Sequence, residues 1–280
     1  MTHSALTYEQ VSYLVQFIHP MKHYAGMPGR FDDAAAAALF GIDAATYCRI
    51  REGFADNARR AAGELLADGA FAAQVDRLPF KRLDTIVAVG DSLTDDDQSW
   101  LEILRHVLAV RRAGDGIKLI NAGISAETTT EIFKRFIDVV RMQPDWIFFA
   151  AGANDTWYWT DAPIKLSVSL PETERNLTAM HQYAALRTRA RWVWFTPPAI
   201  ISERVESHWY QGSFDMMTRN EDLDAIAQFI RSHPYPCVDL QAALGNPPHP
   251  DLLLSDGLHP SINGHQMIVR ALADRLTSPS

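Results

Sequence analysis

The sequence predicts an α/β protein: a three-layer α/β/α sandwich with about five parallel strands, preceded by an all-helical N-terminal extension. Beyond residue 80, short apolar runs alternate with longer stretches of helical periodicity. The apolar runs lack the alternation of a half-exposed sheet, so we expect strands that are buried on both faces and joined by helical crossovers. Before residue 81 the periodicity is helical only. We therefore divide the chain into an extension, residues 1–80, and an α/β domain, residues 81–280.

The extension contains two amphipathic helical patterns. Residues 8–19 place four apolar side chains on one stripe, and Pro20 is expected to end that helix. A loop rich in glycine and proline follows at residues 26–29, and Asp43 is a suitable N-cap for a long second helix. Three roles are compatible with such a region: a small helical domain, a lid or a dimerisation element. A dimerisation element would make the protein a homo-oligomer. The sequence does not choose among them.

The α/β part contains five apolar runs and five helical stretches. The expected strands cover residues 85–89, 118–121, 146–151, 192–196 and 237–240. The expected helices cover residues 98–112, 128–141, 171–189, 220–232 and 262–276. Ligands of open parallel sheets bind beyond the carboxyl ends of the strands, so candidate catalytic residues should directly follow the strands.

Composition restricts the function classes. The chain has 280 residues and a formal net charge of -8, which gives no support to binding of nucleic acid or of an anionic membrane. The two cysteines, Cys48 and Cys237, lie far apart and are expected to be free thiols in a reducing compartment. We find no secretory signal pattern at Met1 and no apolar run long enough to span a bilayer. These features predict a soluble cytoplasmic protein without integral membrane contact.

A serine follows the first expected strand. The segment Gly90-Asp91-Ser92-Leu93-Thr94 leads into a helix, so the Ser92 hydroxyl is expected near a helix N-terminus, where backbone N–H groups favour developing negative charge. Serines also cap helices, and that simpler role is the alternative for Ser92. The acidic run at residues 95–97 is interpreted as first-turn carboxylates that complement the helix dipole.

The second and third expected strands are followed by a glycine and an asparagine. Gly123 allows the backbone to approach a ligand closely, and its N–H could point into a site, although a glycine at such a turn is often only structural. Asn154 offers a side-chain amide that can donate to an oxyanion without losing a proton, and an Asx turn is the competing reading. Each signal is weak alone.

An aspartate and a histidine stand three residues apart before the last expected helix. On a tight loop Asp256 can accept from Nδ1 of His259 and leave Nε2 facing a nucleophile. The alternative is a surface loop histidine, since the chain has 10 histidines.

In this order and spacing the four motifs resemble the SGNH, or GDSL-type, hydrolase family. The matching residues are Ser92, Gly123, Asn154 and His259, with Asp256 completing a triad, and the resemblance covers roughly residues 84–276. It implies a flavodoxin-like sheet, a shallow active site and no metal or organic cofactor. It also implies an oxyanion hole formed by the backbone N–H groups of Ser92 and Gly123 and the side chain of Asn154. The long extension before the nucleophile departs from the simplest family pattern.

Three consecutive aromatic residues follow Asn154 in the sequence. Trp157, Tyr158 and Trp159 are expected in a loop at the active edge, where they cannot all be buried in one direction. We interpret at least one as lining an acyl or alcohol pocket, with simple loop packing as the alternative.

The function predicted from these residues is hydrolysis of a small-molecule carboxylic ester through an acyl-enzyme intermediate on Ser92. No GxSxG elbow, P-loop or GxGxxG motif is present, which argues against an α/β-hydrolase elbow and against nucleotide binding. Two alternatives remain: an acyltransferase that uses the same triad, and a non-catalytic interaction protein on the same fold.

Overall fold

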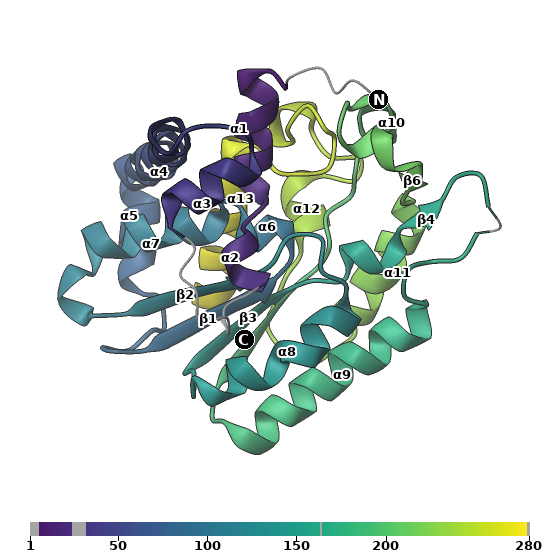
Figure 1. Cartoon of the computed structure of the whole chain (residues 1–280). Helices are drawn as coiled ribbons and strands as arrows, with labels where there is room; N and C mark the ends of the chain where they lie inside the picture. The colour runs from purple at the N-terminus through teal and green to yellow at the C-terminus, as the bar shows by residue number, and fades with distance from the viewer. Residues whose placement is uncertain (1–5, 24–31, 163, 279–280) are drawn as a thin grey trace.

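The computed structural model describes residues 6–23, 32–162 and 164–278. Its centre is a five-stranded, wholly parallel sheet with the strand order β2-β1-β3-β5-β7, which confirms the predicted α/β architecture (Figure 1). The strands are β1 (Thr85–Gly90), β2 (Lys118–Gly123), β3 (Trp146–Ala150), β5 (Arg191–Phe195) and β7 (Cys237–Val238). The loop expected at residues 26–29 lies outside the described residues.

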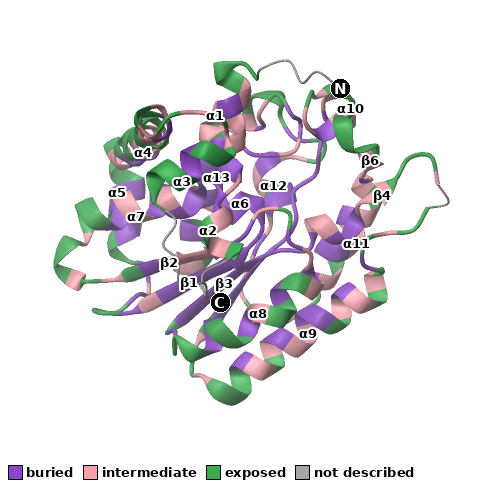
Figure 2. Cartoon of the chain, in the orientation of Figure 1, coloured by how far each residue is buried: buried purple, intermediate pink, exposed green. Residues whose placement is uncertain are grey.

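Helices cover both faces of this sheet. On one face lie α7 (Trp100–Arg111), α12 (Leu240–Leu244) and α13 (Ile262–Thr277), and on the other lie α8 (Thr129–Arg141), α9 (Leu170–Arg187) and α11 (Asn220–Arg231). Alternate residues of β1 serve the two layers: Ile86 and Ala88 belong to the first core cluster, and Val87 and Val89 to the second. Figure 2 shows the sheet as the most continuously buried part of the chain. Double-sided burial is the reason why the strands are apolar without alternation.

The N-terminal helices lie on the first layer and beside the end of the sheet. They are α1 (Tyr8–Phe17), α2 (Pro20–His23), α3 (Asp33–Leu39), α4 (Ala44–Ala67) and α5 (Gly69–Asp76). Asp43 caps α4 by accepting from the Thr46 N–H at 2.8 Å, as the sequence predicts. Pro20 begins α2 rather than only ending α1, since a helix N-terminus tolerates proline.

The apolar contacts show how these helices are attached. Side chains of α4 and α5 belong to the same buried cluster as α7 and α13, whereas α1, α3 and α4 form a smaller cluster of their own around Val15 and Tyr47. In the described part of the chain, no helix combines the length and the apolar character needed to cross a bilayer.

Short elements complete the edge of the molecule that follows the strands. They are α6 (Ser92–Asp95), η2 (Ala153–Thr156), α10 (Ser202–Ser207), η3 (Gln211–Phe214), and the antiparallel pair β4 (Tyr158–Trp159) and β6 (Met216–Met217). Gly90, the last residue of β1, pairs with Gly123 of β2 and with Ala150 of β3, so these three strands end side by side. The turns after them therefore face one common site.

Candidate active site

The turn from β1 into α6 presents Ser92. Asp91 is the N-cap of α6, and its carboxylate accepts from the Leu93 N–H at 3.2 Å. A Cβ at Gly90 would lie 2.5 Å from Ala150 O, so only glycine fits where the strand passes its neighbour. Asp91 is buried, and this burial raises its pKa to about 7. It supports the turn and makes no hydrogen bond to His259.

Ser92, His259 and Asp256 lie in a hydrogen-bonded row. Ser92 Oγ is 2.9 Å from His259 Nε2, and His259 Nδ1 is 2.6 Å from Asp256 Oδ2. A carboxylate can only accept, so the proton between Asp256 and His259 belongs to Nδ1 and leaves Nε2 free to accept from the serine. The N–H groups of Leu258 and His259 donate to the other carboxylate oxygen at 2.8 and 2.9 Å. The loop thus holds Asp256 and His259 in register.

The charges of the pair support each other. Burial alone would lower the pKa of His259, but the charge of Asp256 and its hydrogen bond outweigh burial, and the pKa is raised. Burial would likewise raise the pKa of Asp256, yet the charge of His259 and the hydrogen bonds from the loop bring it to about 2. Asp256 is therefore ionised at neutral pH, and His259 is a base somewhat stronger than free imidazole.

Gly123 does not supply the expected N–H donor. Its N–H donates to the side chain of Asn121 at 3.0 Å, within the strand itself. A Cβ at Gly123 would lie 2.7 Å from the Asp95 N–H nitrogen, so the glycine is required for the close approach of β2 to α6. This placement corrects the sequence-based assignment: Gly123 has a packing role.

Ala126 is better placed than Gly123 to offer a backbone N–H beside Ser92. It lies three residues beyond Gly123, lines the cavity beside Ser92, and has a φ of 65°, in the left-handed region that favours glycine. Among the described residues we find no hydrogen-bond acceptor for its N–H or for that of Ser92. The sequence carries no glycine here to mark the turn, which is why Ala126 was missed.

Asn154 lies where the sequence predicts. It belongs to η2, directly after Gly152, whose φ of 117° lets the chain turn at the end of β3. Asn154 Nδ2 donates to Glu127 O at 3.1 Å and lines the cavity, so one amide hydrogen fixes the side chain while the second is available.

A cavity of about 500 Å³ opens beside Ser92 and His259. Of the three consecutive aromatics, Trp157 lines it, whereas Tyr158 and Trp159 do not. Tyr158 stacks under Arg219, whose guanidinium carbon is 5.5 Å from the ring centre, and Trp159 is 63% exposed. Both residues belong to the strand β4, which pairs with β6.

Helix α1 contributes two side chains that the sequence analysis did not identify. The Tyr13 hydroxyl donates to Asp256 Oδ2 at 2.9 Å, and Phe17 stacks on the His259 ring with centroids 4.1 Å apart. The first contact joins residues 243 positions apart. Nothing local in the sequence signals it, because Tyr13 lies beside the apolar stripe of α1 and not on it.

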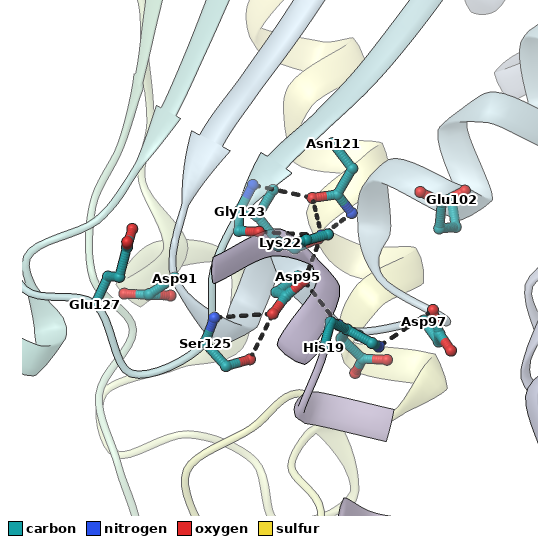
Figure 3. Close-up of polar contacts among 12 residues, drawn as sticks. His19, Lys22, Asp91, Asp95, Asp97, Glu102, Asn121, Gly123, Ser125 and Glu127 are labelled. Atoms are coloured by element: carbon teal, nitrogen blue, oxygen red, sulfur yellow. Dashed lines mark hydrogen bonds and ion pairs between the residues drawn. The ribbon is translucent and has the colours of Figure 1, made fainter. Parts of the chain in front are cut away.

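The acidic run after Ser92 holds this helix in place (Figure 3). Asp95 is in contact with His19 Nδ1 at 2.8 Å and with the Lys22 ammonium, and it also accepts from Ser125 N–H at 2.8 Å. Gln16 donates to Asp96 Oδ2 at 2.8 Å. We call this group the anchor cluster: Gln16, His19, Lys22 and Arg51 of the extension with Asp95, Asp96 and Asp97.

The cationic members of the anchor cluster pair with Asp95 and Asp97, whereas the neutral Gln16 bonds to Asp96. Asp97 receives Arg51 Nε at 2.9 Å, and His19 Nε2 lies 3.4 Å from it, an ion-pair distance without hydrogen-bond geometry. Opposing their burial, His19 lowers the pKa values of both Asp95 and Asp97. The run therefore does more than complement a helix dipole: it docks the extension.

Within the described residues, no group of three or more His, Cys, Asp or Glu side chains is arranged to hold a metal ion. The geometry combines a serine hydroxyl, an imidazole base, an ionised carboxylate and nearby N–H donors at one sheet edge, an arrangement suited to nucleophilic attack on an acyl carbon.

Comparison with known proteins identifies the family. A model of the GDSL-like lipase/acylhydrolase family matches residues 88–267, and the chain belongs to this family. It is a carboxylic ester hydrolase. An acetylxylan esterase from Geobacillus stearothermophilus is 29% identical over 212 residues, which are 67% of this chain and 91% of that protein.

Solved structures agree in fold. The acetylxylan esterase Axe2 from Geobacillus stearothermophilus superposes with a TM-score of 0.56 at 23% identity, over 71% of this chain and 96% of that one. LAE5, an α/β hydrolase from the metagenome of Lake Arreo, Spain, gives 0.55 at 23% identity, over 71% and 99%. The matched residues of the family model begin at 88, beyond the N-terminal helices.

Proposed function

We propose that this esterase works by two-step acyl transfer on Ser92, with His259 as the base and Asp256 as its orienting carboxylate. The observation that carries the proposal is the continuous row from Ser92 Oγ to His259 to Asp256, with contacts of 2.9 and 2.6 Å. It is supported by the family membership and by the position of the row at the mouth of the cavity.

In the first step His259 Nε2 accepts the proton of Ser92 as Oγ bonds to the acyl carbon of the ester. The carbonyl electrons move to oxygen and form a tetrahedral oxyanion. The C–O bond to the alcohol then breaks, the electron pair of that bond leaves with the alcohol oxygen, and the protonated imidazole returns the proton to it. A water molecule repeats the sequence and releases the acid from Ser92.

Three groups are suited to hold the oxyanion: the N–H of Ser92, the N–H of Ala126 and the side-chain amide of Asn154. The two backbone N–H groups have no acceptor among the described residues, and Asn154 is held by Glu127 O. Such preorganised donors stabilise the charge as it develops and need no reorientation during the reaction.

The substrate we propose is a small-molecule ester. The relatives named as acetylxylan esterases make acetyl esters of xylo-oligosaccharides one class to test. A cavity of about 500 Å³ falls within the range of small-molecule sites, about 300–1,000 Å³.

A fluorophosphonate probe with intact-mass analysis tests the mechanism. The wild type should gain one adduct, located on Ser92 by peptide mapping, and Ser92→Ala should gain none. Ser125→Ala is the matched control, because Ser125 also lines the cavity and should not be the labelled residue. A wild type that gains no adduct would overturn the mechanism, and transfer to an added alcohol in preference to water would favour an acyltransferase.

A further inference from the structure

Helix α1 forms one wall of the substrate cavity. Tyr13, Leu14, Phe17 and Ile18 all line it, next to Ser92 and His259. The rest of the lining is mixed: Trp157, Tyr210, Phe214, Met216 and Leu258 are apolar or aromatic, and Ser125, Thr128, Asn154, Ser167 and Gln211 are polar. The described lining contains no Asp, Glu, Lys or Arg side chain. A ligand in this cavity would therefore meet mostly carbon atoms close to the nucleophile.

The wall is held in place by more than apolar contacts. Just behind the cavity, Gln16 bonds to Asp96 and its carbonyl accepts from the Asp97 N–H at 3.3 Å, while His19 pairs with Asp95. Asp95 and Asp96 are 2% and 0% exposed. Figure 3 shows His19 and Lys22 converging on Asp95 from the N-terminal segment. These contacts lie within a few residues of Ser92, so the wall and the nucleophile share one rigid support.

We propose that helix α1 is the specificity element of this esterase and selects esters with an extended apolar acyl group over acetyl esters of carbohydrates. The proposal rests on the mechanism given under Proposed function. Each methylene buried against the wall should raise kcat/KM about fourfold, the equivalent of ~0.8 kcal/mol, until the cavity is filled. Along α1, the apolar side chains of Leu14 and Phe17 would offer the hydroxyl groups of a carbohydrate no hydrogen-bond partners.

A chain-length series of p-nitrophenyl esters, from acetyl to decanoyl, tests this, together with acetylated xylo-oligosaccharides. For the wild type we expect kcat/KM to rise from acetyl to a maximum at about hexanoyl, by more than tenfold. Leu14→Trp, which fills the cavity beside the acyl group, should lower the hexanoyl-to-acetyl ratio of kcat/KM at least tenfold. Leu186→Trp, at an 81% exposed position on α9, is the matched control and should keep the ratio.

The outcomes separate the two proposals. Hydrolysis at Ser92 with the acetylated sugar as the best substrate, or with a ratio that Leu14→Trp leaves unchanged, would overturn the role of α1 and leave the mechanism intact. Ester hydrolysis that persists in Ser92→Ala would overturn the mechanism itself.

A second inference rests on hydrogen bonds and not on the cavity. The Gln211 amide donates to the Tyr13 hydroxyl at 3.0 Å, and Tyr13 donates to Asp256 Oδ2, the same oxygen that receives His259 Nδ1. Asp256 is fully buried. We infer that Tyr13 is a positioning residue that holds the carboxylate during proton transfer between Ser92 and His259.

The environment keeps Tyr13 in its donor form. Burial, followed by the charge of Asp256, raises the pKa of the phenol. Its hydroxyl therefore stays protonated at all working pH values and can only stabilise the negative carboxylate. The other titratable groups that influence His259 are Asp91 and Asp96, on the nucleophile side, and His208, whose ring lies 5.0 Å from that of Tyr13.

The test compares Tyr13→Phe with Tyr8→Phe, a 58% exposed tyrosine on the same helix. Tyr13→Phe should lower kcat about tenfold with little change in KM. Because the carboxylate loses a donor, its attraction for the His259 proton grows, and the pH profile of kcat/KM should move to higher pH. Tyr8→Phe should match the wild type. A fall in kcat with an unmoved pH profile would mean that the Tyr13 hydroxyl does not act through the Asp256–His259 pair, and an unchanged kcat would exclude a role of the hydroxyl.

Discussion

Replacement of His19 by glutamine should remove a pH-dependent part of the stability. His19 is 9% exposed, and its Nδ1 is 2.8 Å from Asp95. Burial lowers its pKa, but the hydrogen bond to Asp95 and the charges of Asp95 and Asp97 overcome burial and raise it to about 9. The imidazole is therefore protonated in the folded protein at neutral pH. Its unfolded-state pKa is about 6.5.

The magnitude follows from the difference between the two pKa values. The difference of about 2.5 between the two pKa values corresponds to about 3.5 kcal/mol at ~1.4 kcal/mol for each pKa unit. Because the folded protein binds this proton more tightly, the contribution is fully present below about pH 6.5 and is lost as the pH rises through about 9. An independent figure for breaking a buried ion pair is about 3–5 kcal/mol, of the same order.

Urea unfolding, followed by tryptophan fluorescence, measures the effect. The free energy of unfolding of the wild type minus that of His19→Gln should fall by about 3 kcal/mol between about pH 6 and about pH 9.5. His249→Gln, which removes an imidazole with a 68% exposed side chain, is the control and should show no comparable fall. A difference that stays constant within about 1 kcal/mol between these pH values would refute the buried ion pair.

Three further predictions concern catalysis. Asn154→Ala should lower kcat about 10²–10³-fold with the fold intact, and a loss below threefold would remove Asn154 from the oxyanion site. Ala126→Gly should keep activity within a few-fold and raise the free energy of unfolding by up to about 1 kcal/mol, because glycine adopts a φ of 65° without strain; thermal unfolding measures this, and destabilisation would contradict it. For the wild type, kcat/KM should rise with pH through an apparent pKa above about 6.5, because His259 acts as a neutral base and Asp256 raises its pKa. A rate that is already maximal at about pH 5.5 would exclude this base.

The parts of the fold that follow from local sequence pattern could be predicted. The strands β1 and β3 are apolar runs because both faces are covered, and the helices after them show a clear period. Ser92, Asn154, Asp256 and His259 could be placed at one edge because parallel strands carry their following turns to the same side. The sequence does not give the distances between these residues. In the folded structure Ser92 Oγ and His259 Nε2 lie 2.9 Å apart.

Two features depended on information that the sequence does not display. A glycine at a sheet edge suggested an oxyanion donor at Gly123, but the side chain of Asn121 accepts that N–H. The N–H that we propose as the donor belongs instead to Ala126, a residue type that rarely signals a left-handed turn. In both cases the residue type was taken to indicate the backbone conformation, and the structure shows a different relation between the two.

The contacts of helix α1 could not be predicted for a different reason. Tyr13 meets Asp256 across 243 positions, and the anchor cluster joins residues 16–51 to residues 95–97. Periodicity reports which side of a helix is apolar, not which distant loop it will contact. The pattern could give the existence of α1 but not its position over the site.

The position of the anchor cluster has a consequence for how the site is organised. Ser92 begins α6 and Asp95 ends it, so one short helix carries the nucleophile at one end and the docking point of the extension at the other. Movement of α1 away from His259 would break the His19–Asp95 pair and leave the buried carboxylate without this partner within one helical turn of Ser92, which is costly. A lid that opened for each turnover would have to meet that cost every time. The contacts therefore favour a fixed wall over a lid that opens for each substrate.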